Sequence, residues 1–261
     1  LLSLVPPSER PAPCRRQTGN ASQPQLVHPL LSAGGGVMKQ DDLKIVHLDL
    51  PAGPEQLAEL ELGSIVYLNG TIFTGREGLY MRVVEQGYAL PSGLTTIASA
   101  NFHCSPAASV NADGSYKIGA VTATASFRFS KWMAKWFEIS GTKIIIGKGG
   151  MSGEDYRNVF VPNGAVYLTT VGYGTGALLG RSIKQVREVH WLEEMGIAQA
   201  LWVFNVENFG PLIVDSDMQG NSFFERENNK INARISDLYE GLKEPTLRRY
   251  GETTNREDEV I

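Results

Sequence analysis

The sequence has few cysteines, and this shortage excludes several classes of protein. Only Cys14 and Cys104 occur among its 261 residues, and they stand in unrelated contexts. Two isolated cysteines cannot form the disulfide framework of a small secreted domain, and no C-x-x-C pair is present to bind zinc. We therefore expect a protein of a reducing compartment, the cytoplasm, with no metal site of its own.

An excess of positive charge is also missing. The chain has 24 Lys and Arg against 28 Asp and Glu, a formal net charge of -4. Such a balance provides no basic surface for nucleic acid or for an anionic membrane. No window approaches the ~18 consecutive apolar residues of a membrane-spanning helix. We expect neither a nucleic-acid partner nor insertion into a membrane.

Hydrophobic periodicity is absent from both ends of the chain. Residues 1–37 are rich in Pro, Ser, Gly and Gln without an unbroken apolar segment, which predicts a disordered leader. Patterned sequence begins after Met38. We interpret Met38 as the natural start and the preceding residues as vector-derived or over-annotated, with a transit peptide as the alternative. Residues 244–261 predict a frayed, charged tail, so one folded domain is expected at 38–243.

Within that domain, strand and helix patterns follow one another irregularly. β-Branched or alternating segments predict two strands around Gly70, a hairpin turning at Asp113-Gly114 and two strands joined at 208–211. Further strands are predicted at 43–50, 97–104, 143–146 and 164–171, and helices at 76–86, 130–139 and 231–242. Because strict βαβ alternation is missing, we expect a layered α/β domain of mixed sheets.

Two glycine-rich loops follow predicted strands, and neither has the spacing of a nucleotide-binding loop. Gly147-Lys148-Gly149-Gly150 lacks the spacing and the hydroxyl of the P-loop pattern G-x-x-x-x-G-K-[ST]. In VGYGTGALLG, residues 171–180, the third glycine of G-x-G-x-x-G falls on Ala177 or Leu179. These patterns argue against a phosphate as the partner of Lys148 and leave a carboxylate or water.

Three cations follow β-rich segments and stand beside small or hydroxyl residues: Arg76, Arg128 and Lys148. If they converged, they would clamp a dicarboxylate, because arginine binds a carboxylate bidentately and lysine adds a point charge. Each cation alone is better explained as a surface charge or a salt-bridge partner. The pattern by itself does not establish that they converge.

His103 and Cys104 suggest a thiol nucleophile beside a base, but neighbouring residues of a strand point to opposite faces. We interpret Cys104 as a core residue beside a half-exposed His103. The four tryptophans, among them Trp132 and Trp136 on one predicted helix face, are expected to be packing residues.

The motifs taken together resemble one family. GSIVYLNGTIFTGRE, TATASFRF, GTKIIIGKGGM, GAVYL, the segment IKQVREVHWLEEMGIAQALWVFNVENFGPLIVDSD, and GNS occur in this order between about Leu60 and Phe224. This series is similar to the β subunit, or C-terminal half, of iron–sulfur class I fumarases and L-tartrate dehydratases. The IGKGGM loop and the FGPLIV ending are specific to that family in combination.

The resemblance implies a three-layer swivelling β/β/α domain that packs on an α subunit, in a heterotetramer of two α and two β subunits. In the family, the α subunit holds a [4Fe-4S] cluster with its cysteines, and the β domain closes the active site. The family's cationic, threonine and serine positions match residues of this chain. We expect catalytic roles for Thr124, as the proton-transfer residue, and Lys148, and substrate binding by Arg76, Arg128, Lys148 and Ser126.

Two motifs depart from the family pattern. The family's R-D-x-x-H is here Arg76-Glu77-Gly78-Leu79-Tyr80, and G-P-T-T-S-x-R-M has become TATASFRF. Tyrosine can donate a hydrogen bond but does not titrate near neutral pH as histidine does. The leading prediction is the β component of a hydro-lyase acting on a C4 dicarboxylate of the fumarate/malate type. L-Tartrate, another acid, and a non-catalytic structural or regulatory subunit are the alternatives.

Overall fold

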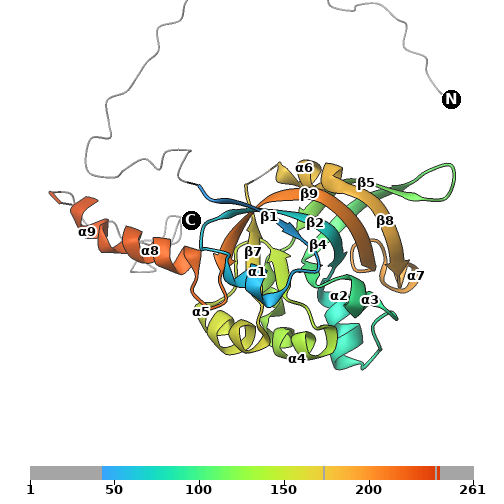
Figure 1. Ribbon diagram of the computed structural model, residues 1–261, viewed down its shortest axis with the longest axis horizontal. Helices are drawn as coiled ribbons and strands as arrows, with labels where there is room; N and C mark the ends of the chain where they lie inside the picture. The colour runs from blue at the N-terminus through green and yellow to red at the C-terminus, as the bar shows by residue number, and fades with distance from the viewer. Residues whose placement is uncertain (1–42, 173, 239, 242–261) are drawn as a thin grey trace, which may run out of the picture. The chain divides into compact units, whose positions relative to one another are not determined.

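The computed structural model of this protein is built around one large sheet, most of whose strands are parallel (Figure 1). The structure describes residues 43–172, 174–238 and 240–241, so the predicted leader and the predicted tail lie outside the described residues. Parallel pairing joins five strands in the order β1, β2, β3, β6 and β7: Ile45–Asp49, Ile65–Thr74, Ala100–Phe102, Ile144–Gly147 and Val166–Thr170.

Two antiparallel strands complete this sheet and give it its mixed character. Strand β9 (Leu201–Ser216) pairs with β7 near its end and with β2 along its length, while β8 (Ile183–His190) pairs with its first half. Strands β2, β3, β6, β7 and β9 thus form a closed ring of pairings. Their parallel members direct their carboxyl ends to one edge, where ligands commonly bind in α/β sheets.

A hairpin forms the second sheet. Strands β4 (Cys104–Val110) and β5 (Tyr116–Ala123) are antiparallel, and the predicted Asp113-Gly114 turn joins them. Helix α6 (Thr175–Ser182) packs directly on β5. A Cβ atom at Gly180 would lie 2.8 Å from the Ala120 Cα, so this approach requires glycine.

The remaining helices are short. Helices α2, α4 and α5 lie on the face of the sheet opposite α6, whereas α8 and α9 project outward (Figure 1). Their bounds are Pro54–Ala58 (α1), Glu77–Tyr80 (α2), Leu94–Ile97 (α3), Ser130–Ser140 (α4), Gly153–Asp155 (α5), Leu192–Met195 (α7), Phe223–Ala233 (α8) and Ile235–Leu238 (α9), with π-helical turns at Met81–Glu85 and Tyr156–Phe160 and 3₁₀ turns at Ser126–Phe129 and Val161–Asn163. Among these described segments no helix is long and apolar enough to cross a bilayer.

Strand β6 separates the two hydrophobic clusters of the core. Ile144 and Ile146 point into one cluster and Ile145 into the other, and all three are fully buried. Burying an isoleucine side chain contributes about 1.5–3 kcal/mol. An uninterrupted apolar run is therefore the pattern expected of a strand covered on both faces.

The mixed α/β fold is confirmed, and three local expectations are wrong. Residues 65–74 form one strand, because Gly70 at φ 113 makes room for the Leu50 carbonyl, 2.7 Å from a built Cβ. Strand β9 likewise continues through 208–211, where Asn208 takes φ 48 within the ladder. The closing helix begins at Phe223, before the predicted 231. The three-layer swivelling arrangement stays a prediction.

The expected packing role of the tryptophans is confirmed for Trp132, Trp136 and Trp202, which are buried. Trp191 is only partly buried.

Candidate functional site

Two predicted site residues, Arg76 and Lys148, follow the carboxyl ends of β2 and β6, and Thr124 follows β5. Hydrogen bonds continue the sheet beyond these ends, from Gly75 N to Phe102 O at 2.9 Å and from His103 N to Ile146 O at 2.8 Å. Arg76 and Lys148 come directly after these last paired positions. One edge of the sheet therefore gathers residues that are far apart in the sequence.

A short extended segment lies across that edge and joins Thr124 to Lys148. The Thr124 amide donates to the His103 carbonyl at 2.6 Å, and the Lys148 amide donates to the Thr124 carbonyl at 3.2 Å. The Ser126 amide donates to the Lys148 carbonyl at 3.3 Å, so Ala125 and Lys148 form a parallel bridge. Thr124 is 8% exposed and Lys148 is exposed, so the backbone bonds bring a buried threonine and an exposed lysine to neighbouring positions.

The side chains of the two arginines contact residues outside this segment. Arg128 Nη2 lies 3.6 Å from Glu77 Oε2, and both side chains are about half exposed. Arg76 is the N-cap residue of α2 and donates from Nη1 to the Ser105 hydroxyl on β4. Its Nε–H is buried without a partner, so the guanidinium retains an unused donor.

A groove of about 630 Å³ opens beside Lys148. Residues 120–123 of β5 form one wall, and Thr170 with the first turns of α6 forms the other. Thr124, Arg76 and Arg128 are not among its lining residues. The structure thus brings Thr124 and Lys148 together and places Arg128 beside Glu77, but it does not enclose all the predicted residues in one cavity.

Ser126 lies beneath the surface, whereas Arg128 and Lys148 are exposed. It is 0% exposed, accepts a hydrogen bond from the Tyr167 hydroxyl at 2.7 Å and contacts His103 Nδ1 at 2.7 Å. In this conformation its hydroxyl faces protein groups and not the groove. Direct substrate binding by Ser126 therefore stays a prediction that requires this contact to open.

The expectation of a half-exposed His103 is wrong, because the imidazole is completely buried. Burial lowers the pKa of His103 to about 3, so the ring is neutral at physiological pH. Cys104 is a buried core residue as expected, and burial raises its pKa. The two side chains point into opposite clusters, which confirms that they form no nucleophile and base pair.

Comparison with known proteins gives the family of the chain. A family profile described as Fumarase C-terminus matches residues 25–227. The chain belongs to the Fumarase C-terminus family. It is 32% identical over 192 residues to the L(+)-tartrate dehydratase subunit beta of Escherichia coli, covering 73% of this chain and 91% of the relative.

Two further relatives of this Fumarase C-terminus chain have provisional names. A Methanocaldococcus jannaschii protein named as an L(+)-tartrate dehydratase subunit beta is 34% identical over 187 residues, 70% of this chain and 93% of the relative. A Geobacillus stearothermophilus protein named as a class I fumarate hydratase is 29% identical over 182 residues, 70% of this chain and 34% of the relative. The family resemblance drawn from the motifs is confirmed.

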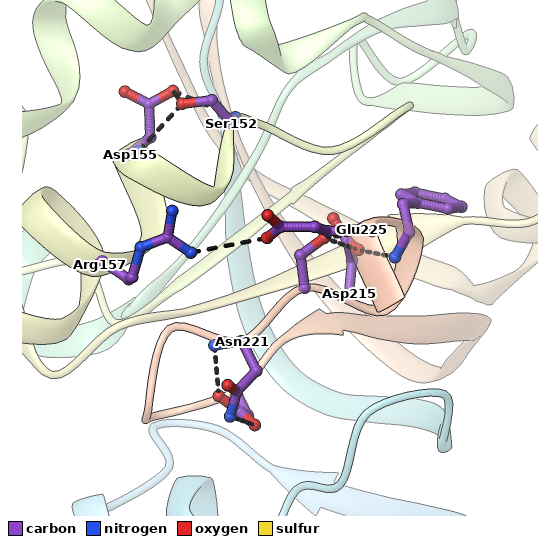
Figure 2. A network of polar contacts seen from close by, with 9 residues as sticks. Ser152, Asp155, Arg157, Asp215, Asn221 and Glu225 are labelled. Carbon is purple, nitrogen blue, oxygen red and sulfur yellow. Dashed lines mark hydrogen bonds and ion pairs between the residues drawn. The ribbon is translucent and has the colours of Figure 1, made fainter. Parts of the chain in front are cut away.

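The sequence motifs did not identify the buried support under the glycine loop of this family member. The Tyr156 hydroxyl accepts from the Met151 amide at 2.8 Å and donates to Asp215 Oδ2 at 2.5 Å. Figure 2 shows Asp215 next to the ion pair of Arg157 with Glu225, Nη1 to Oε2 3.5 Å. Burial raises the pKa of Asp215. A carboxylate directly after the apolar residues LIV in LIVDSD was the signal that would have indicated this residue.

The described residues do not fit an iron–sulfur cluster. Cluster irons are held by several cysteine thiolates, and Cys104 is the one cysteine within the described part of the chain. Across 43–172, 174–238 and 240–241, no three His, Cys, Asp or Glu side chains come together as metal ligands. Any cluster used by this family member would have to be held elsewhere.

Proposed function

We propose that this chain is the β component of a hydro-lyase that adds water to, or removes it from, a C4 dicarboxylate. The observation that carries the proposal is the backbone connection of Thr124 to Lys148 at the carboxyl edge of the sheet. This connection places the two residues on neighbouring segments, and Lys148 lines an open groove. The names of the relatives support a dehydratase or hydratase activity.

In this proposal the cations bind the two carboxylates of the substrate. Lys148 lines the groove and would hold one carboxylate as a point charge. Arg128 would exchange its exposed contact with Glu77 for the other carboxylate, and Arg76 has an unused Nε–H donor. Exposed ion pairs are weak, so the release of Arg128 from Glu77 costs little.

Thr124 is the proposed proton-transfer residue. A threonine hydroxyl is a poor base, so a nearby positive charge has to stabilise its alkoxide. Lys148 is the candidate cation, because its backbone is bonded to that of Thr124. Its ammonium would have to turn towards the Thr124 hydroxyl in the enclosed site to favour the ionised form.

The proposed partner is an α subunit that carries the [4Fe-4S] cluster, with two copies of each subunit in the assembly. The relatives' names contain "subunit beta", which supports a second subunit. Because Thr124 and the arginines lie outside the groove, a partner surface is the proposed means of enclosing them with the substrate. When bound, the cluster would supply a Lewis acid for the substrate hydroxyl.

L-Tartrate is the substrate to test first, because the relatives that this chain covers almost completely are named for it. Fumarate follows, since the class I fumarate hydratase relative is also similar. The experiment is anaerobic co-expression with the α subunit, reconstitution of the cluster, and detection of oxaloacetate or malate by mass spectrometry. An intact complex with a full cluster that converts neither acid would contradict the C4 assignment and leave another acid or a non-catalytic role.

The variant Lys148→Ala tests the site itself. Because Lys148 is exposed and its backbone bonds do not need the side chain, the variant should fold and bind the α subunit normally. Turnover should fall by at least about a hundredfold, the range typical for loss of an electrostatic group at a reacting centre. Lys184→Ala, which removes another exposed lysine, paired with Glu207, is the matched control and should retain full turnover.

A further inference from the structure

Five polar side chains form a continuous line of hydrogen bonds beneath the proposed site. They come from different elements, and none of them is exposed to solvent. Successive contacts between them measure 2.7 Å, and the line runs through Asn101, Tyr80, His103, Ser126 and Tyr167. No carboxylate, lysine or arginine takes part in these bonds, and the buried His103 is neutral at physiological pH.

The direction of these bonds follows from one backbone group. The Phe73 carbonyl can only accept, and it receives a hydrogen bond from Asn101 Nδ2 at 3.3 Å. The amide oxygen of Asn101 therefore faces Tyr80, whose phenol donates its single proton to it. The Tyr80 oxygen has no proton left for His103, so the imidazole must donate to it from Nε2.

The tautomer of His103 fixes the rest of the line. With the proton on Nε2 of a neutral ring, Nδ1 can only accept, and its neighbour is the Ser126 hydroxyl. Ser126 therefore donates to His103 and accepts from the Tyr167 hydroxyl. All protons in the line point the same way, from Tyr167 towards Asn101, and no member is left without its partner.

The line contacts each of the three segments that carry the proposed site. Tyr80 belongs to α2, whose N-cap residue is Arg76. His103 accepts from the Thr124 amide through its carbonyl. Ser126 and Tyr167 meet the start of the lysine loop, because a Cβ at Gly147 would lie 1.9 Å from the Ser126 Oγ and 2.6 Å from the Tyr167 hydroxyl.

We propose that this buried line of hydrogen bonds holds Arg76, Thr124 and Lys148 in their relative positions. His103, Ser126 and Tyr167 are then positioning residues, and His103 is fixed as its Nε2–H tautomer. The proposal rests on the proposed function for the identity of the site. Apolar side chains would fill the same space without the cost of burying hydroxyl and amide groups. A fully satisfied polar network instead selects one arrangement of the elements that it joins.

The tautomer is tested without any activity measurement. In the full chain labelled with ¹⁵N-histidine, His103 should show a protonated Nε2 and an unprotonated Nδ1 between pH 6 and 8. In Tyr80→Phe the Nε2–H loses its acceptor, so the ring should shift towards the Nδ1–H form, which can donate to Ser126. An Nδ1–H ring in the wild type, or a Tyr80→Phe spectrum identical to that of the wild type, overturns the proposed direction.

The positioning role is tested by Ser126→Ala against the matched control Ser140→Ala. Ser140 is also a buried serine with bonded hydroxyl, but it lies at the far end of α4. Hydrogen exchange at the Lys148 amide should accelerate at least about tenfold in Ser126→Ala and remain unchanged in Ser140→Ala. Tyr167→Phe, which keeps the ring, should show the same effect if Ser126→Ala folds poorly. Equal exchange in all variants overturns the positioning role.

The complex with the α subunit separates this proposal from the proposed function. With L-tartrate or fumarate as the probe, Ser126→Ala should lower kcat/KM by about ten- to a hundredfold, the scale expected for a small misplacement of reacting groups. Ser140→Ala should stay within about twofold of the wild type. If the wild-type complex converts neither acid, the proposed function fails while the exchange at Lys148 still decides the positioning role. If the wild-type complex is active and the Ser126→Ala complex has the same kcat/KM, the positioning role is refuted and the proposed function stands.

Discussion

Lowering the pH should destabilise this protein through one residue, His103. Burial lowers the pKa of His103 from 6.5 to about 3, so the folded protein holds the ring neutral while the unfolded chain takes up a proton below pH 6.5. Above pH 6.5 the ring is neutral in both states and does not affect the free energy of unfolding. As the pH falls from 6.5 towards 3, only the unfolded chain is protonated, and the folded state is progressively destabilised. Between pH 7 and pH 5 the loss amounts to about 2 kcal/mol.

The assay is urea unfolding of the full chain at pH 5, 6 and 7, followed by tryptophan fluorescence, for the wild type and His103→Gln. Glutamine is neutral at each pH, so the difference in unfolding free energy should narrow by about 2 kcal/mol from pH 7 to pH 5. The raised pKa of Asp215 has the opposite sign and favours the fold at low pH, but it is common to both chains and cancels. A difference that stays constant over this range would refute a buried, neutral His103.

Three further predictions concern other parts of the molecule. Tyr156→Phe removes the donor to Asp215 and should lower the unfolding free energy, measured in urea, by about 1–3 kcal/mol. The control Tyr88→Phe, at an exposed ring, should change it by less than ~0.5 kcal/mol. Equal effects would show that the bond from Tyr156 to Asp215 does not support the loop. Gly70→Ala should lower the thermal midpoint more than Gly114→Ala, because both have positive φ but only Gly70 meets a backbone carbonyl; the reverse order would show that the close approach of Leu50 does not constrain Gly70. Glu77→Gln should leave stability within ~0.5 kcal/mol and lower KM for a dicarboxylate in the complex by freeing Arg128, and an unchanged KM would remove Arg128 from the binding role.

Family membership and most element positions were predictable from the sequence because local signals carried them. The apolar run of 144–146 indicates a strand buried on both faces, and Asp113-Gly114 marks the hairpin. Where a local signal depended on a distant neighbour, the prediction was wrong. A glycine usually interrupts a strand pattern, but Gly70 lies against the backbone of Leu50 and stays within the strand. Leu50 is outside any local window around Gly70, so the local pattern did not reveal this contact.

The candidate site shows the same division. Its cations and Thr124 could be named from motifs, since each motif is continuous in the chain. The bond pairs that join Thr124 to Lys148, and His103 to Tyr80 and Ser126, connect residues more than twenty positions apart. His103 was expected to be half exposed because its strand neighbour Cys104 was assigned to the core, and alternation left the other face to solvent.

The sequence by itself determined the family, the mixed α/β class and the residue types at the edge of the sheet. Only the tertiary structure decided which of these residues face the groove, which lie beneath it, and that His103, on the side opposite Cys104, is covered by Tyr80 of α2 and by Phe129. The physical reason is that periodicity records which sides of a strand are apolar, whereas the burial of a polar side chain depends on hydrogen-bond partners supplied by other elements.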